Sequence, residues 1–168
     1  MNRSGHPAFE RLFQEHAEPL FAFLVYRTGD RHLAEDLVAD AFERVLRARA
    51  RFDPRRGSEK NWLYAIAVNL VRDQARRQNV ETNALQRVGA YEARLPDDGA
   101  QGEVEERDAL AKALATLREE EREAIALRFG ADLKLREVAG VLGEKESAVE
   151  KRISRGLQKL RHELESWA

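Results

Sequence analysis

The order of apolar and polar residues divides the chain into two periodic parts and a less regular middle. Apolar residues recur every three or four positions over residues 9–24, 33–46 and 62–71, a spacing that places them on one face of an α-helix. Three amphipathic helices with short connections predict a compact helical bundle over residues 1–78. The same spacing returns over residues 108–168, where further stripes predict a second helical bundle.

Short polar segments predict where individual helices begin and end. Asp30 follows Gly29 and can cap the second helix, because Asp accepts hydrogen bonds from the unpaired N–H groups of a first turn. Residues 52–57 contain Pro and Gly and predict a loop, and Ser58 directly after it can cap the third helix. In the second bundle, Gly143 is expected to end one helix before the last one starts.

Residues 79–107 lose the helical pattern and predict a linker. They combine Gly, Pro and acidic residues with few apolar ones, which is typical of flexible segments, and a short helix is expected near residues 84–91. The predicted fold class is all-α, with two small helical domains, 1–78 and 108–168, joined by a flexible linker. The alternative is that the two bundles dock into one compact body.

Residues 135–157 have the spacing of a helix-turn-helix, in which the second helix enters the major groove of DNA. Gly143 allows the tight turn, and Val149, Ile153 and Leu157 would form the buried face of the second helix. A plain helical hairpin would produce much of the same periodicity and remains an alternative. The exposed face of the second helix would carry Ser147, Ala148, Lys151, Arg152 and Arg155.

Charge varies along the chain, although the formal net charge is only −1. Residues 1–80 carry 14 basic and 11 acidic side chains, residues 81–108 carry 3 and 8, and residues 109–168 carry 12 and 11. The basic residues are concentrated in 47–77 and 134–161, and such stripes are typical of surfaces that bind phosphate groups. On charge alone, a solvated helix face explains them equally well.

The composition disfavours several functional classes. The chain has no cysteine, so disulfides and thiolate metal sites are excluded. The four histidines lack the spacing of metal ligands, and neither a Gly-rich phosphate loop nor a pair of nucleophile and base is evident. We therefore expect no enzyme, no metal and no cofactor. No apolar run approaches the roughly 20 residues that span a bilayer and no signal peptide is evident, so we expect a cytoplasmic protein without membrane insertion.

Three segments, in this order and spacing, resemble the sigma-70 family of RNA polymerase sigma factors, and specifically its extracytoplasmic-function (ECF) group. They are residues 34–45, residues 52–69, and the helix-turn-helix together with residues 121–124 before it. The resemblance implies that the chain binds core RNA polymerase and promoter DNA, and directs promoter recognition and DNA melting for transcription initiation. It also makes an anti-sigma factor a candidate partner.

The resemblance implies where each partner binds: the first bundle would be sigma region 2, for the polymerase clamp and the −10 promoter element. The second bundle would be region 4, for the polymerase flap and the −35 element. The matching polymerase-binding residues are Asp36, Leu37, Asp40, Glu43 and Leu46. Those for the −10 element are Phe52, Arg55, Arg56, Asn61, Asn69, Arg72, Arg76 and Arg77. Those for the −35 element are Lys145, Ser147, Ala148, Lys151, Arg152 and Arg155, with Arg152 as the leading contact.

Acidic residues depart from the family pattern around the helix-turn-helix. Glu144 and Glu146 occupy positions that are usually hydrophobic, and Glu150 replaces a frequent Lys or Arg. Acids near a recognition helix repel phosphate, so they would weaken −35 binding. Glu150 fits a capping box with Ser147, which would start the last helix there. The acidic run at residues 119–121 is expected to be a solvated helix N-terminus, favoured by the helix dipole.

Two other functions remain open on the sequence. A helix-turn-helix regulator could bind DNA as a dimer without polymerase, although it would not need the first bundle. A polymerase-binding adaptor that has lost promoter reading would explain the acids in the recognition helix.

Overall fold

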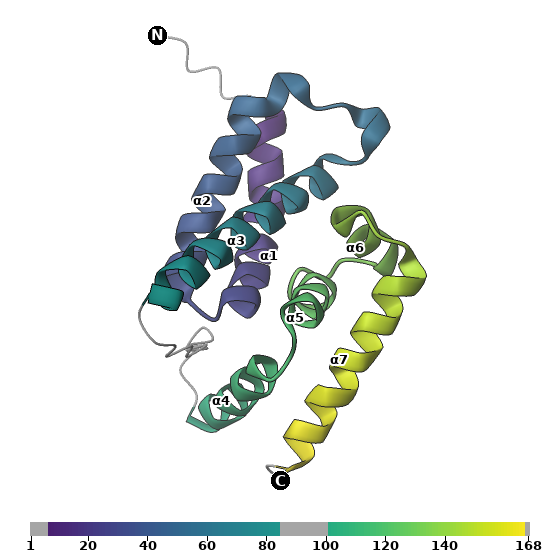
Figure 1. Cartoon of the computed structure of the whole chain (residues 1–168). Coiled ribbons are helices and arrows are strands. Elements are labelled where there is room, and N and C mark those ends of the chain that lie inside the picture. Colours follow the sequence, from purple (N-terminus) through teal and green to yellow (C-terminus); the bar gives the residue numbers. More distant parts are fainter. Residues whose placement is uncertain (1–6, 85–100, 167–168) are drawn as a thin grey trace.

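Figure 1 shows the structure, a computed structural model in which residues 7–84 and 101–166 are described. In that part of the chain all regular secondary structure is helical, as the sequence predicts. The first bundle contains α1 (Pro7–Thr28), α2 (Arg31–Ala48), the short 3-10 helices η1 (Arg49–Arg51) and η2 (Pro54–Arg56), and α3 (Glu59–Ala84). The second bundle contains α4 (Gln101–Ala115), α5 (Glu119–Ile125), the π-helix η3 (Ala126–Gly130), α6 (Leu135–Leu142) and α7 (Glu146–Ser166).

Helices extend into both ends of the expected linker, residues 79–107. Helix α3 continues to Ala84, and α4 begins at Gln101. The middle of that segment, where the short helix near residues 84–91 is expected, lies outside the described residues. Within the described ranges, no helix is long and apolar enough to cross a lipid bilayer.

The predicted start and stop residues act as expected. The Asp30 side chain accepts a hydrogen bond of 3.1 Å from the Leu33 N–H, and the Ser58 hydroxyl accepts one of 3.1 Å from the Asn61 N–H. Gly143 ends α6 with a φ of 66°, a conformation that glycine adopts without the steric cost of a Cβ. Residues at the boundary itself, through a capping side chain or a glycine φ angle, therefore set these three helix ends.

The expected capping box at Ser147 is wrong. Helix α7 begins at Glu146, so Ser147 already lies inside its first turn. The Lys145 carbonyl accepts the N–H groups of Ala148 and Val149 at 3.1 and 3.2 Å, which starts the helical hydrogen bonding two residues before Ser147. The tight turn after α6 is short, and the chain becomes helical before the serine is reached.

Leu157 is 41% exposed, and its expected place on the buried face of α7 is wrong. At about 3.6 residues per turn, the buried stripe passes from Ile153 through Gly156 to Leu160 and leaves Leu157 at its edge. A Cβ on Gly156 would force the end of the Ile125 side chain of α5 to shift. The glycine therefore leaves room for this side chain between α7 and α5.

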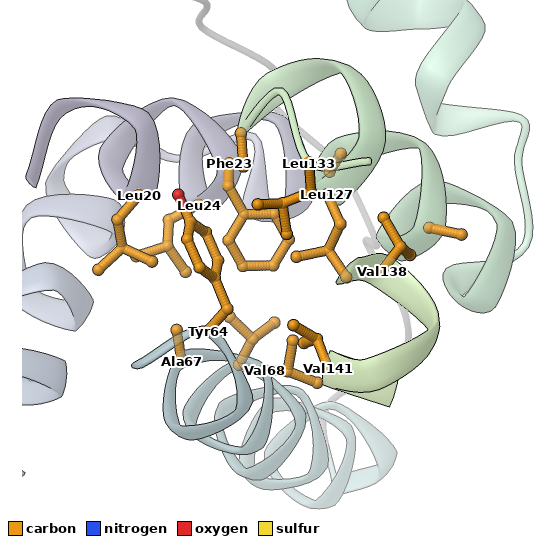
Figure 2. Close-up of a cluster of buried hydrophobic side chains, with 14 of the residues drawn as sticks. Leu20, Phe23, Leu24, Tyr64, Ala67, Val68, Leu127, Leu133, Val138 and Val141 are labelled. Atoms are coloured by element: carbon orange, nitrogen blue, oxygen red, sulfur yellow. The ribbon is translucent and has the colours of Figure 1, made fainter. Parts of the chain in front are cut away.

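The two bundles pack against each other and share one hydrophobic core, because α1 contacts η3 and α3 contacts α6. Figure 2 shows Phe23 of α1 beside Leu127 of η3 and Leu133 of the following loop, with Tyr64 of α3 close by. All four side chains are buried, and the Phe23 and Tyr64 rings meet with centroids 6.0 Å apart. Burial of apolar surface favours this docked arrangement of the two bundles.

A glycine permits the close approach of η3 to α1. A Cβ at Gly130, the last residue of η3, would lie 2.9 Å from Tyr26 Cδ2 and 3.3 Å from Phe23 Cα. The contact with the Tyr26 ring is closer than Cβ atoms in proteins normally show, and the contact with the Phe23 backbone is tight, so a side chain here would force the ring and the helices to shift. Glycine fits this contact between the bundles without such a shift.

The acidic run at the start of α5 is only partly solvated, which corrects the expectation for residues 119–121. Glu119 and Glu120 are exposed, but Glu121 is buried and accepts hydrogen bonds of 2.9 and 2.8 Å from Lys159 of α7. It also accepts the Arg118 N–H at 3.1 Å. Burial raises the pKa of Glu121, but these hydrogen bonds outweigh it and hold the pKa below its usual value.

The buried hydroxyl of Tyr64 leads to a stability prediction. Its oxygen has no hydrogen-bond partner among the described residues, although the side chain is fully buried. Tyr64→Phe keeps the ring and removes an unsatisfied polar group, so the free energy of unfolding should rise by about 1 kcal/mol. Urea denaturation followed by circular dichroism measures the change. A fall of similar size would show that the hydroxyl is hydrogen-bonded, for instance to water.

Acid titration tests the contact between Glu121 and Lys159. Because the folded-state pKa lies below the usual 4.5, the carboxylate stabilises the fold fully above that pH, and this contribution is lost as the pH falls through the folded-state pKa. Glu121→Gln should therefore lower the thermal midpoint at neutral pH, and the midpoint should fall less steeply from about pH 5 to about pH 3. Glu106→Gln, which removes an exposed carboxylate of the same bundle, is the matched control. Equal midpoints for Glu121→Gln and wild type would contradict a stabilising contact.

Candidate nucleic-acid interface

The loop between α2 and α3 is held in a defined shape. Asp53 caps η2 by accepting the Arg55 N–H at 3.0 Å. Gly57 then takes a φ of 149°, which glycine adopts readily, and turns the chain into α3. Phe52 packs against Trp62 of α3 with ring centroids 5.2 Å apart. The Asp53 cap and the contact between the Phe52 and Trp62 rings therefore hold the loop in this shape.

A pocket of about 520 Å³ lies between this loop, α3 and α6. Phe52 and Trp62 give it aromatic surface, and Arg51 and Arg56 add positive charge. The Asn61 Oδ1 has no hydrogen-bond partner among the described residues, but it is buried, so a ligand reaches it only if the surrounding side chains move. Aromatic rings beside basic groups suit an unstacked nucleotide base and its phosphate.

The other residues expected at the −10 element lie mostly in solvent, and one does not. Arg55, Arg56, Asn69, Arg76 and Arg77 are exposed. Arg72 is partly buried, and its Nη2 lies 2.6 Å from Glu123 Oε1 of α5. The hydrogen bond to Glu123 raises the pKa of the Arg72 guanidinium. In this arrangement Arg72 is therefore occupied by a carboxylate.

Helix α7 carries the second basic surface. Of the residues expected at the −35 element, Lys145, Ser147, Ala148, Lys151 and Arg155 are exposed. A shallow pocket along the same face is lined by Ser147, Glu150, Lys151, Ser154, Arg155 and Gln158. These side chains offer both donors and acceptors, as the recognition of base edges requires.

Arg152, expected as the leading contact on the exposed face, is half-buried. Its Nη2 lies 2.7 Å from the Glu144 carboxylate, in the turn before α7. This ion pair accounts for an acid at position 144, since it ties the turn to the helix. Glu146 is the first residue of α7, where the helix dipole favours a negative charge.

The polymerase-binding residues expected on α2 divide into a solvent-facing row and one core residue. Asp36, Asp40 and Glu43 are exposed, and Leu46 is 47% exposed. Leu37 is buried in the core and supports α2 from within, so it offers no contact surface. Among the described residues, no group of three His, Asp or Glu side chains is placed to hold a metal ion.

Two exposed apolar surfaces were missed by the sequence analysis. Phe13 of α1 is 47% exposed, with its ring centroid 4.9 Å from that of Phe42. In the second bundle, Phe129 and Leu157 are exposed and border an apolar pocket of about 220 Å³, which Leu114 also lines. The sequence signal for these surfaces is an additional apolar residue beside the buried stripe of the helix. Leu157, directly after the buried Gly156, is an example.

Comparisons of the sequence identify both bundles. The family described as Sigma-70 region 2 matches residues 12–80, and the one described as Sigma-70, region 4 matches residues 107–160. The ECF RNA polymerase sigma factor BldN of Streptomyces coelicolor is 32% identical over 145 residues, which are 84% of this chain and 54% of BldN. This chain therefore spans about half the length of that relative. The RNA polymerase sigma factor CarQ of Myxococcus xanthus is 34% identical over 92% of this chain and 87% of CarQ.

Solved structures share the fold. The sigma factor RpoE from Bartonella quintana, in complex with the anti-sigma factor NepR, has a TM-score of 0.80 at 23% identity over 94% of this chain and 97% of that chain. CnrH, in complex with the cytosolic domain of CnrY, has a TM-score of 0.73 at 26% identity over 98% of this chain and 92% of that chain. With both regions matched in order and with ECF sigma factors among the relatives that are at least 30% identical, the chain belongs to the sigma-70 family of RNA polymerase sigma factors, and to its ECF group.

Proposed function

We propose that the chain binds core RNA polymerase and directs promoter recognition and DNA melting during transcription initiation. The pocket of the α2–α3 loop carries this proposal. It joins the Phe52 and Trp62 rings to an unpartnered Asn61 oxygen, within the segment that matches region 2. Melting a promoter requires the capture of an unstacked base, and aromatic surface with a polar acceptor suits that task.

Each bundle would bind a different part of the polymerase and of the promoter. Residues 1–78 would act as region 2 on the polymerase clamp and the −10 element, and residues 108–168 as region 4 on the polymerase flap and the −35 element. Residues 79–107 would join them. The apolar pocket beside Phe129 and Leu157 suits an apolar segment of the flap. Two weak DNA-binding modules on one chain gain affinity through their high effective concentration.

Sigma factors are non-enzymatic regulators of transcription, and this chain would act in the cytoplasm without a catalytic site, metal or cofactor of its own. An anti-sigma factor is a further candidate partner, of the kind that NepR is for RpoE. A dimeric regulator without polymerase is disfavoured by the region 2 match over residues 12–80. The adaptor alternative loses support, since Glu144 and Glu146 have structural roles beside the recognition helix.

Transcription with purified components tests the proposal directly. Core polymerase, the full chain and a library of genomic promoter fragments should yield transcripts from a defined subset of promoters that core polymerase alone does not produce. Binding to core polymerase without any such transcripts would favour the adaptor instead.

The acidic face of α2 leads to a prediction about core binding. Asp36 and Asp40 lie one helical turn apart and are both exposed. Replacing both with Lys reverses the charge of this face without touching the core, so binding to core polymerase should be lost while helical content stays the same. Gel filtration with core polymerase and circular dichroism measure the two properties. A matched double variant, Glu18→Lys with Glu165→Lys, changes the net charge equally at exposed acids elsewhere. Co-elution of the α2 variant at wild-type level would rule out this face.

The recognition helix leads to a prediction about phosphate contacts. Lys151 and Arg155 are exposed, whereas Arg152 is already paired with Glu144. Lys151→Ala and Arg155→Ala should each reduce the slope of log affinity against log salt by about 0.9, and Arg152→Ala by clearly less. Fluorescence anisotropy of a labelled DNA duplex over a range of salt concentrations measures these slopes with the full chain. The idea that Glu144 withholds Arg152 from DNA fails if all three variants change the slope equally.

A further inference from the structure

Glu150 is an exposed acid of α7 that differs from the two acids before it. Glu144 pairs with Arg152 at 2.7 Å, and Glu146 begins the helix. The capping box that would engage Glu150 with Ser147 is not formed, because α7 begins before the serine. In the part of the chain that the structure describes, no hydrogen bond or ion pair involves the Glu150 side chain. Its carboxylate is therefore available to a partner outside the chain.

The surface around Glu150 consists of two neighbouring rows of polar side chains. Glu150 and Ser154 lie one helical turn apart and form one row. Lys151 and Arg155, also one turn apart, form the other. All four residues line the shallow pocket on α7, whose volume is about 370 Å³. Helix α7 packs on α4, α5 and α6 through its apolar side (Figure 1), so both rows face solvent.

The position of Glu150 along α7 suits contact with DNA bases. In a helix-turn-helix, residues near the N-terminus of the second helix contact base edges in the major groove. Glu150 is the fifth residue of α7, and the exposed Lys151 follows it directly. Basic side chains in such a place bind phosphates and fix the orientation of the helix. With Lys151 and Arg155 on the DNA backbone, the neighbouring row that begins at Glu150 would face the bases.

An ionised carboxylate only accepts hydrogen bonds, which restricts the bases that it can bind. In the major groove, guanine offers two acceptors, N7 and O6, and thymine offers the acceptor O4 and a methyl group. Adenine has an amino group, but its acceptor N7 lies beside it and repels the second carboxylate oxygen. Cytosine offers the N4 amino group and no acceptor of its own. A carboxylate in the groove therefore favours cytosine.

The negative charge of Glu150 acts against all other sequences. An acid close to DNA repels phosphates, and a carboxylate that loses its water without gaining a donor is destabilised. Lys151 and Arg155 offset the repulsion, since both are exposed cations of the same surface. A hydrogen bond from cytosine removes the remaining penalty at one sequence only. Because specificity is a difference of affinities, the acid increases specificity even where it lowers affinity for DNA in general.

We propose that Glu150 is a specificity-determining residue, which accepts a hydrogen bond from the N4 amino group of a cytosine in the −35 element. A Lys or Arg, frequent at this position in the family, would favour guanine instead. The proposal rests on the proposed function, because it takes α7 as the helix that reads the −35 element. It adds which base this residue of the chain selects.

Selection of DNA by the full chain, with and without core polymerase, tests this role. The probe is a pool of duplexes with a randomised segment. Wild type should enrich cytosine at one position about tenfold over the other bases, which is the discrimination that a good base contact provides. Glu150→Ala should lose this preference and Glu150→Gln should shift it toward adenine, while the other selected positions stay the same. Glu165→Gln, which removes an exposed carboxylate of α7 outside the pocket, is the matched control.

Removal of a single amino group tests the contact itself. The selected cytosine is replaced by a pyrimidine analogue that lacks only the 4-amino group, in a labelled duplex whose binding is followed by fluorescence anisotropy. The analogue also weakens pairing with guanine, and Glu150→Ala measures that effect alone. Wild type should lose about tenfold more affinity than Glu150→Ala on this replacement, because only wild type also loses a hydrogen bond to the protein.

Two results would contradict the role of Glu150. If all variants select the same bases and the Glu150 variants only bind every duplex more tightly, the acid is a repulsive charge and not a base contact. If the analogue weakens wild type and Glu150→Ala equally, the carboxylate does not bind that amino group. Circular dichroism confirms that each variant keeps its helices. A wild-type chain that selects no sequence, even with core polymerase, would instead contradict the proposed function and the role of Glu150 with it.

Discussion

A carboxylate shielded from water needs positive charge beside it, and for Glu123 that charge comes from across the boundary between the bundles. Glu123 lies in α5, whereas Arg27 and Arg72 lie in α1 and α3. Removing one member of such a buried pair typically costs about 3–5 kcal/mol, because the other charge stays behind without a partner. The position of α5 therefore depends on two arginines of the first bundle. The helix-turn-helix follows α5 after η3 and a short loop, so its position depends on them as well.

Apolar burial and this ion cluster contribute in different ways. Phe23, Leu127 and Leu133 exclude water from the interface, but apolar contact is not directional and tolerates some sliding. The carboxylate of Glu123 accepts from fixed guanidinium groups and so selects one register. Gly130 adds a steric condition, because a side chain at that residue would force the Tyr26 ring of α1 to shift and would press on the Phe23 backbone.

Features set by neighbouring residues could be predicted from the sequence. The caps at Asp30 and Ser58 and the stop at Gly143 depend on hydrogen bonds and φ angles within a few residues, and all three were found. The exception is Ser147, where the turn after α6 closed before the predicted cap was reached. Charge counts could not distinguish the exposed Lys151 from Arg72, since Arg72 is neutralised by a residue 51 positions away. The docking of the bundles could not be predicted from the sequence for the same reason. Each apolar stripe shows that one face of a helix is buried, but not against which other helix.

Because a linker joins the two bundles, the interface between them forms in competition with the other contacts that each bundle makes. One chain holds the two bundles at high effective concentration, which favours contact between them and would equally favour the joint binding to the −10 and −35 elements that we propose. An interface held by apolar burial alone would not depend on charge. A buried ion pair contributes little net stability compared with apolar groups of similar size, yet it is specific for a partner of opposite charge. Placing Glu123 and Glu137 against Arg27, Arg72 and Lys60 therefore makes the register of the docked bundles depend on charge, which apolar burial alone would not do.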